Sequence, residues 1–174
     1  MSAGEARTRI KTEPLSEDAY ANYGNVIAAS DSKPWRPANM GTSKRFNHLC
    51  KVENLRQDVA KLNVCIFRCS ALKTIPLEMK LLEKHQFSTQ VFLPMDRNAR
   101  YLAIVCLGGD RPDLNTLKAF IVTGAQGISY YPGVWHYPMT ALDSEIDFTC
   151  LVYEDDTKED CTVVQLDSPM LIEI

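Results

Sequence analysis

The sequence lacks any apolar run long enough to cross a bilayer, and its first residues lack the apolar core of a secretion signal. It also lacks an excess of basic residues, because the net charge is -3 and residues of both signs are interspersed along the chain. These absences argue against a membrane, secreted or nucleic-acid-binding protein. We therefore expect a cytoplasmic protein with a small-molecule partner and no membrane or nucleic-acid partner.

A paired-cysteine motif is also missing, although the chain contains six cysteines. Three residues separate Cys65 from Cys69, where a zinc ribbon has two, and no second pair follows. Several of the cysteines lie in or beside apolar runs such as NVCIF and AIVCLGG. Because free cysteine packs as a small hydrophobic side chain, we expect structural, reduced thiols.

Long helical periodicity is absent, which disfavours a doubly wound α/β fold. The 174 residues fit one domain, residues 1–174, with a sizeable core. Ser16 can cap a short helix that Gly24 would end. Beyond it, short apolar runs alternate with turn residues, as in an all-β barrel or sandwich. The predicted strands are 43–50, 62–69, 77–85, 89–94, 101–107, 117–122, 127–131, 136–142, 147–153 and 162–164.

The segment LEMKLLEKH is the most informative of these strands. Side chains alternate along a strand, so Leu77, Met79, Leu81, Glu83 and His85 are predicted to share one core-facing side. A buried carboxylate and imidazole are costly unless they pair with each other, bind a metal or line a cavity. Both would lie near the end of the strand, at the mouth of a barrel.

Two motifs resemble those of cupin barrels. Glu83, His85 and Gln90 follow an E-x-H-x4-Q spacing, a variant of the cupin pattern H-x-H-x4-E. The segment GISYYPGVWHYPM matches the second cupin motif, with a glycine, two aromatic residues, a Pro-Gly turn and then His136. In cupins both motifs converge on one pocket, so we expect His136 to face the other three residues.

The wider sequence resembles the ureidoglycolate lyase family. The resemblance rests on PLSEDAYANYGNVI, NMGTSKRF, LEKHQFSTQVFLPM, LGGDRPDLNTLKAFIVTGAQGISYYPGVWHYPM and IDFTCL. It implies an all-β, cupin-like (jelly-roll) barrel with one or two short helices, assembled as a homodimer. It also implies an enzyme, a carbon–nitrogen lyase that splits ureidoglycolate into glyoxylate and urea in allantoin degradation.

The resemblance suggests His136, Glu83 and His85 as catalytic residues. Imidazole titrates closest to neutrality, which makes His136 the first choice for proton transfer. Glu83 and His85 would assist as an acid–base pair. The structural alternatives are a core histidine bonded to the backbone, and a buried salt bridge that closes the barrel end.

A metal site is a second interpretation of the same residues. Two histidines and one carboxylate can hold a divalent ion, with Gln90 as a further candidate ligand. Glutamate and glutamine stand where many metal-binding cupins have histidine and glutamate, and an amide oxygen is a poor ligand for a soft metal. Nickel or manganese is suggested by the resemblance, and the sequence leaves the need for an ion open.

Substrate-binding candidates are more widely spread. Arg45 is the candidate carboxylate clamp, because a guanidinium grips two oxygens at once, and a solvated surface arginine is the alternative. Arg68 interrupts an apolar run, and Lys118 opens a strand, so both are candidates for the pocket or for the outer surface. Tyr131 and Trp135 are expected to pack the pocket wall. The remaining candidates are Asn39 and Gln90.

Two other functions are also compatible with the sequence. A cupin isomerase or epimerase acting on a sugar derivative would use Tyr130 or Tyr131 opposite a histidine. A non-catalytic cupin would bind a small acid without converting it.

Overall fold

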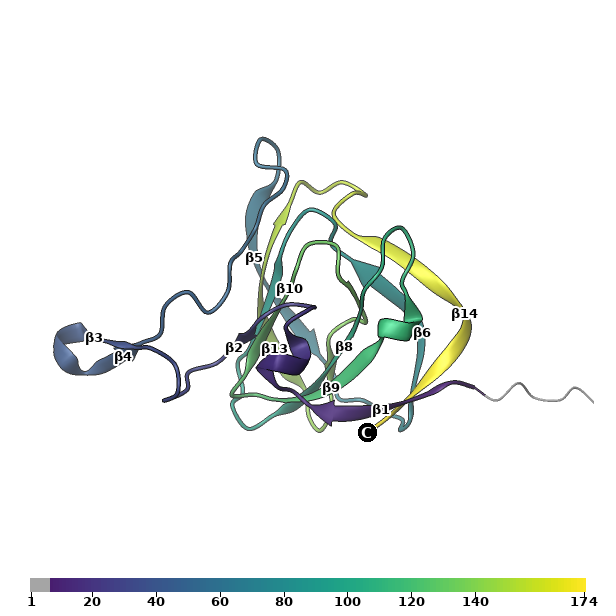
Figure 1. Ribbon diagram of the computed structural model, residues 1–174, viewed down its shortest axis with the longest axis horizontal. Helices are drawn as coiled ribbons and strands as arrows, with labels where there is room; N and C mark the ends of the chain where they lie inside the picture. Colours follow the sequence, from purple (N-terminus) through teal and green to yellow (C-terminus); the bar gives the residue numbers. More distant parts are fainter. Residues whose placement is uncertain (1–6) are drawn as a thin grey trace, which may run out of the picture.

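The computed structural model describes residues 7–174, which form two β layers (Figure 1). The first layer is a closed barrel, because β11 pairs with both β6 and β8 and so joins the two ends of the sheet. Its strands, in order around the barrel, are β11 (Trp135–His136), β6 (Leu77–Lys84), β14 (Thr162–Glu173), β1 (Arg9–Pro14), β9 (Lys118–Thr123) and β8 (Arg100–Cys106), and β12 (Thr140–Ala141) pairs with β8 outside the ring.

The second layer is a five-stranded sheet that packs on the outer face of β8 and β9. Its strands, in order, are β2 (Val26–Ile27), β10 (Gly127–Tyr130), β7 (Gln90–Pro94), β13 (Ile146–Glu154) and β5 (Lys61–Cys69). The expected all-β barrel is confirmed.

Strand β8 divides two hydrophobic cores, because its successive side chains point to opposite faces. Tyr101, Ala103 and Val105 join the core between the two layers. Leu102 and Ile104 join the core that fills the closed barrel. A strand buried on both faces has no polar side, which explains the continuous apolar run of this segment.

The one α-helix within residues 7–174, α1 (Glu17–Tyr20), begins as predicted, since the Ser16 hydroxyl accepts a hydrogen bond from the backbone N–H of Ala19. It ends at Tyr20, with Ala21 as its C-cap, before Gly24. Gly24 allows a close approach between two backbone segments and does not end the helix, because a Cβ atom there would lie 1.6 Å from the carbonyl oxygen of Ser129. The other helical turns are η1 (Asn39–Gly41) and η2 (Leu114–Thr116), and across residues 7–174 no helix has the length and apolar character needed to span a membrane.

Most predicted strands are present, with three kinds of exception. The predicted strand 136–142 is divided between β11 and β12. The predicted strand 162–164 is only the start of β14, which continues to Glu173, and 43–50 shortens to β4 (Ser43–Arg45). Strands β1, β2 and β3 (Arg36–Ala38) were not predicted from the sequence.

The predicted alternation along β6 is wrong in its second half. Leu77, Met79 and Leu82 all point into the barrel core, so the side-chain phase changes between Met79 and Leu82. The β6–β14 register shifts in the same region, between Gln165 and Met170 of β14. The shift turns Glu83 away from the barrel interior and toward the five-stranded sheet.

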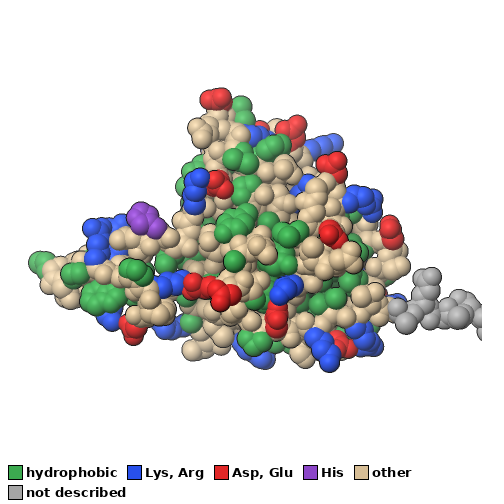
Figure 2. Space-filling model, in the orientation of Figure 1, with side chains coloured by type: hydrophobic (Ala, Val, Ile, Leu, Met, Phe, Trp, Pro, Cys, Tyr) green, Lys and Arg blue, Asp and Glu red, His purple; other side chains and the backbone are tan. Residues whose placement is uncertain are grey.

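One hairpin stands apart from both layers. Strands β3 and β4 pair only with each other and project as an arm, on the side of the molecule where β5 lies (Figure 1). Basic and hydrophobic side chains are exposed together on this arm (Figure 2). Strand β5 is itself the edge of the five-stranded sheet and is exposed along most of its length.

Candidate active site

Three potential ligand atoms meet between the two layers. Glu83 lies near the end of β6 and His85 directly follows that strand, while His136 comes from β11, where it lies directly opposite Glu83 in the ladder. The ligand atoms of the three residues all lie within 4.8 Å of one another. The pocket was expected inside the closed sheet, and this is wrong, because the cluster lies on the outer face of the barrel against Tyr130 of β10.

The ring of His136 is held in one orientation. Its Nδ1 atom is 3.0 Å from the carbonyl oxygen of Val134. A carbonyl oxygen only accepts hydrogen bonds, so Nδ1 carries the proton and Nε2 of the neutral ring keeps its lone pair. The Tyr130 ring stacks on the imidazole at 4.0 Å between centroids and 8° between planes, and the His85 ring lies 5.7 Å away at 14°. This packing leaves Nε2 directed at Glu83.

The carboxylate of Glu83 is the most accessible group of the cluster, with 24% of its side chain exposed against 2% for His136. Its Oε1 atom is 3.6 Å from His136 Nε2, which is beyond hydrogen-bonding distance. Burial raises the pKa of Glu83, but the neighbouring His136 and then His85 outweigh burial and hold this pKa below its usual value. Glu83 is therefore ionised at neutral pH.

His85 is uncharged at neutral pH. Burial and, after it, the nearby His136 lower its pKa to about 4, although Glu83 opposes both effects. A neutral imidazole is the form that binds a metal ion or accepts a proton.

Four buried polar atoms around the cluster have no hydrogen-bond partner within residues 7–174: His85 Nδ1, Gln90 Oε1, the Tyr130 hydroxyl and His136 Nε2. Gln90 and Tyr130 are direct neighbours across the β7–β10 ladder. Leaving a buried polar atom without a partner costs about 1–3 kcal/mol, so four together indicate a place for a polar ligand.

The same donor set fits a divalent cation. Two neutral imidazole nitrogens and one ionised carboxylate form the two-histidine, one-carboxylate arrangement. His85 Nδ1 and His136 Nε2 have no other partner among the described residues, and both are positioned beside Glu83.

The other predicted binding residues lie elsewhere. Trp135 points into the barrel core, where its indole N–H donates to the carbonyl oxygen of Gly109, so it does not line the site. Arg68 is exposed and holds both carboxylate oxygens of Asp147 at 2.8 Å. Lys118 pairs with Glu13 at 3.2 Å.

Three more candidates are outside the cluster in a single chain. Tyr131 lines a separate surface cleft of about 440 Å³, and its hydroxyl accepts a hydrogen bond from Asn25. Asn39 and Arg45 are exposed on the β3–β4 arm.

From the sequence, Tyr130 was a candidate only for a sugar epimerase, and its place in this site was missed. Its ring covers His136 and its hydroxyl is buried without a partner among the described residues. Its position opposite Gln90 is the signal that a strand-pairing argument would have used.

Comparisons with known proteins identify the family of this chain. A family model described as "Ureidoglycolate lyase" matches residues 7–173. Ureidoglycolate lyase from Escherichia coli K12 is 36% identical over 140 residues, covering 80% of this chain and 84% of the relative, and the Salmonella paratyphi B protein of the same name has the same values. Among solved structures, RmlC from Streptococcus suis matches with a TM-score of 0.41 and 15% identity over 72% of this chain and 63% of that chain. The chain belongs to the ureidoglycolate lyase family, as its motifs predict.

Proposed function

We propose that this chain is a ureidoglycolate lyase that releases glyoxylate and urea from ureidoglycolate during allantoin degradation. The observation that supports it most is the cluster of Glu83, His85 and His136, whose unpartnered nitrogen atoms face a shared space in a chain of this family.

The chemistry needs one proton to move from oxygen to nitrogen. Ureidoglycolate is a hemiaminal, in which one carbon carries a hydroxyl group and a urea nitrogen. Loss of the hydroxyl proton forms the carbonyl of glyoxylate as the carbon–nitrogen bond breaks, and the departing nitrogen receives a proton. Water is not consumed, so a single group that takes the proton and returns it completes the reaction.

His136 suits this transfer. Its Nε2 atom keeps a lone pair, and Val134 fixes the protonated Nδ1 on the other side of the ring. Glu83, 3.6 Å from Nε2, stabilises the imidazolium that forms when the proton arrives. His85 and Gln90 present unpartnered polar atoms that can orient the substrate.

A divalent cation is compatible with this site. Glu83, His85 and His136 would hold it, with nickel or manganese suggested by the family, and it would polarise an oxygen atom of the substrate.

We further propose that the enzyme is a homodimer in the cytoplasm. The exposed apolar edge strand β5 supports an interface between copies. All six cysteines are free thiols, which suits a reducing compartment.

The experiment that tests the function follows glyoxylate release from ureidoglycolate by the purified protein. Sustained turnover that is lost in His136→Ala supports the lyase. Binding without product would support the non-catalytic cupin, and inertness toward ureidoglycolate with turnover of a sugar nucleotide would support the epimerase.

A further inference from the structure

The β3–β4 arm exposes large side chains to solvent. Neither strand pairs with the barrel or with the five-stranded sheet. Trp35 is 47% exposed before the first strand, and Met40 is fully exposed at the tip with a positive φ of 55°. A lone two-stranded hairpin is marginally stable in water, so an arm of this kind needs a surface to rest on.

Two arginines face each other across this arm. Arg36 and Arg45 are direct partners in the antiparallel ladder, so their side chains share one face. Like charges directly opposite each other are destabilising, and among the described residues neither arginine forms a salt bridge. Lys44 differs, because it pairs with Asp31 at 2.9 Å and lies over the Trp35 ring.

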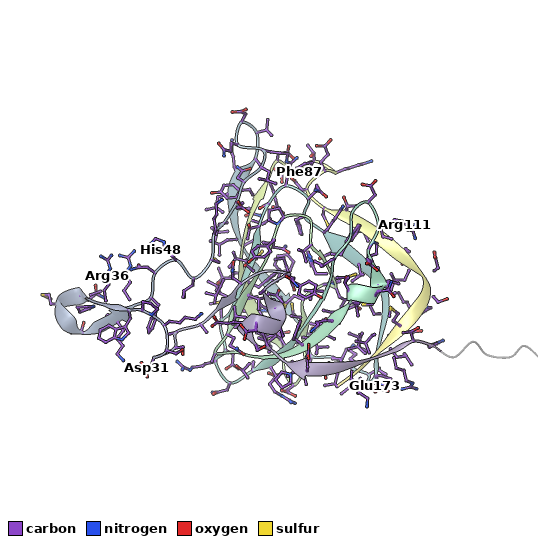
Figure 3. The ribbon with its side chains drawn as sticks, in the orientation of Figure 1. Asp31, Arg36, His48, Phe87, Arg111 and Glu173 are labelled. Carbon is purple, nitrogen blue, oxygen red and sulfur yellow. The ribbon has the colours of Figure 1, made fainter. Side chains whose placement is uncertain are left out.

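Two guanidinium groups on one face form a clamp for a carboxylate. In Figure 3, Arg36 stands on the arm well away from the two layers, with Asp31 and His48 on the same extension. Neither arginine forms a hydrogen bond or ion pair with Glu83, His85 or His136 of its own chain.

The candidate site needs a positive charge to bind the substrate carboxylate. The substrate carries a carboxylate, but the basic side chains close to the site are engaged elsewhere. Lys84 points to the barrel core, donating to the carbonyl oxygen of Gly109 and lying over the Trp135 ring. Arg56 is held between Asp155 and Asp160.

The exposed edge strand β5 indicates which kind of molecule contacts the arm. Its outer face exposes Leu62, Val64 and Ile66, with exposed fractions of 47%, 62% and 54%. Phe67 on its other face is 43% exposed, so this free edge is apolar on both sides. Long apolar edge strands are usually covered, because they promote pairing with another chain. Residues 46–60 connect the arm to β5, and the arm projects on the side of the molecule where β5 lies (Figure 1).

We propose that a second copy of this chain packs on the β5 edge, and that the Arg36–Arg45 clamp of one copy binds the substrate carboxylate in the Glu83–His85–His136 site of the other. Each site would then be complete only in the dimer. The identity of the bound carboxylate rests on the proposed function, whereas the position of the arm does not.

The decisive experiment uses hybrid dimers. One chain carries Arg36→Ala and Arg45→Ala, the other carries His136→Ala, and two different affinity tags isolate the hybrid. Parent dimers of the arm variant should show a KM raised by about 30-fold or more, as expected for the loss of a bidentate, charge-assisted contact. Parent dimers of the His136 variant should be inactive.

The hybrid should recover about half of the wild-type kcat with a normal KM, since one of its two sites receives an intact arm and an intact cluster. A hybrid no more active than its parents would overturn the proposal, because it would mean that each arm serves its own chain or no site. Lys44→Ala, on the same arm, is the matched control and should keep wild-type kinetics.

A second measurement does not depend on turnover. Equal amounts of unlabelled and ¹⁵N-labelled protein are cross-linked, and peptides from residues 33–46 are sought in mixed-mass products joined to peptides of β6 or β11. Mixed-mass links support the swapped arm even if ureidoglycolate is not the substrate. Links confined to single copies, or a monomer in sedimentation at micromolar concentration, would contradict it.

Discussion

His136 lies directly opposite Glu83 on the neighbouring strand, with its Nε2 atom 3.6 Å from the carboxylate. This pairing brings together parts of the chain more than fifty residues apart, and it depends on the two-residue strand β11 that closes the barrel. The barrel closure and the site are therefore one structural feature. Residues that hold β11 in place also hold the imidazole in place.

We expect His136→Ala to lower kcat by about 10²–10⁴-fold, the usual contribution of a positioned acid–base group. The protein should stay folded, because removal of the ring enlarges a space that already holds unpartnered polar atoms. Glyoxylate release and the circular dichroism spectrum check both parts. His48→Asn is the matched control, since His48 is exposed and asparagine tolerates its positive φ of 57°. Near-normal kcat in His136→Ala would remove this residue from the mechanism.

The metal-free protein should lose stability as the pH falls from about 6.5 to about 4. Burial lowers the pKa of His85 to about 4, so the unfolded chain takes up this proton at a higher pH than the folded chain does. The contribution is fully present above the unfolded pKa, near 6.5, and is lost on acidification, up to about 3 kcal/mol.

Urea unfolding of the metal-free protein at several pH values measures this loss. His85→Gln has no titrating ring at this position and should flatten the dependence between these pH values. An equal slope in the variant and the wild-type protein would show that other groups cause the acid sensitivity.

The sequence predicts the parts of this protein that depend on local pattern. Glu83, His85 and His136 stand out because they interrupt apolar strands, and the structure brings their ligand atoms together. The face that Glu83 occupies was not predictable from β6 alone, because the change of phase coincides with a register shift against β14.

Other features depend on distant segments. Strand β1, with the polar sequence RIKTEP, has no strand pattern of its own and forms because β14 and β9 pair with it in parallel. Arg45 could be named as a candidate carboxylate ligand from its chemistry, but its place on an arm outside both layers leaves no periodic signal in the sequence.

Gly24→Ala should destabilise the fold by about 1–3 kcal/mol or more, as expected for a methyl group forced into packed backbone. The new Cβ atom would lie 1.6 Å from the Ser129 carbonyl oxygen, so β10 and the segment after α1 would have to separate. Thermal unfolding measures the effect. Gly109→Ala is the control, because a Cβ atom there meets nothing within 4 Å. Equal losses of Tm in the two variants would contradict the close approach of Gly24 to Ser129.

Addition of Mn²⁺ or Ni²⁺ to the metal-stripped protein should raise Tm, because an ion that binds only the folded cluster stabilises it by mass action. The rise should be absent in Glu83→Gln, which replaces a strong anionic ligand by a weak amide oxygen. Glu78→Gln is the control, since Glu78 is on the same strand but bonds to Arg7 and Lys80 away from the cluster. Metal content and glyoxylate release are measured on the same samples. Full activity at near-zero metal content would leave proton transfer by His136 as the whole mechanism, whereas activity that follows bound metal would assign the two histidines and Glu83 to the ion.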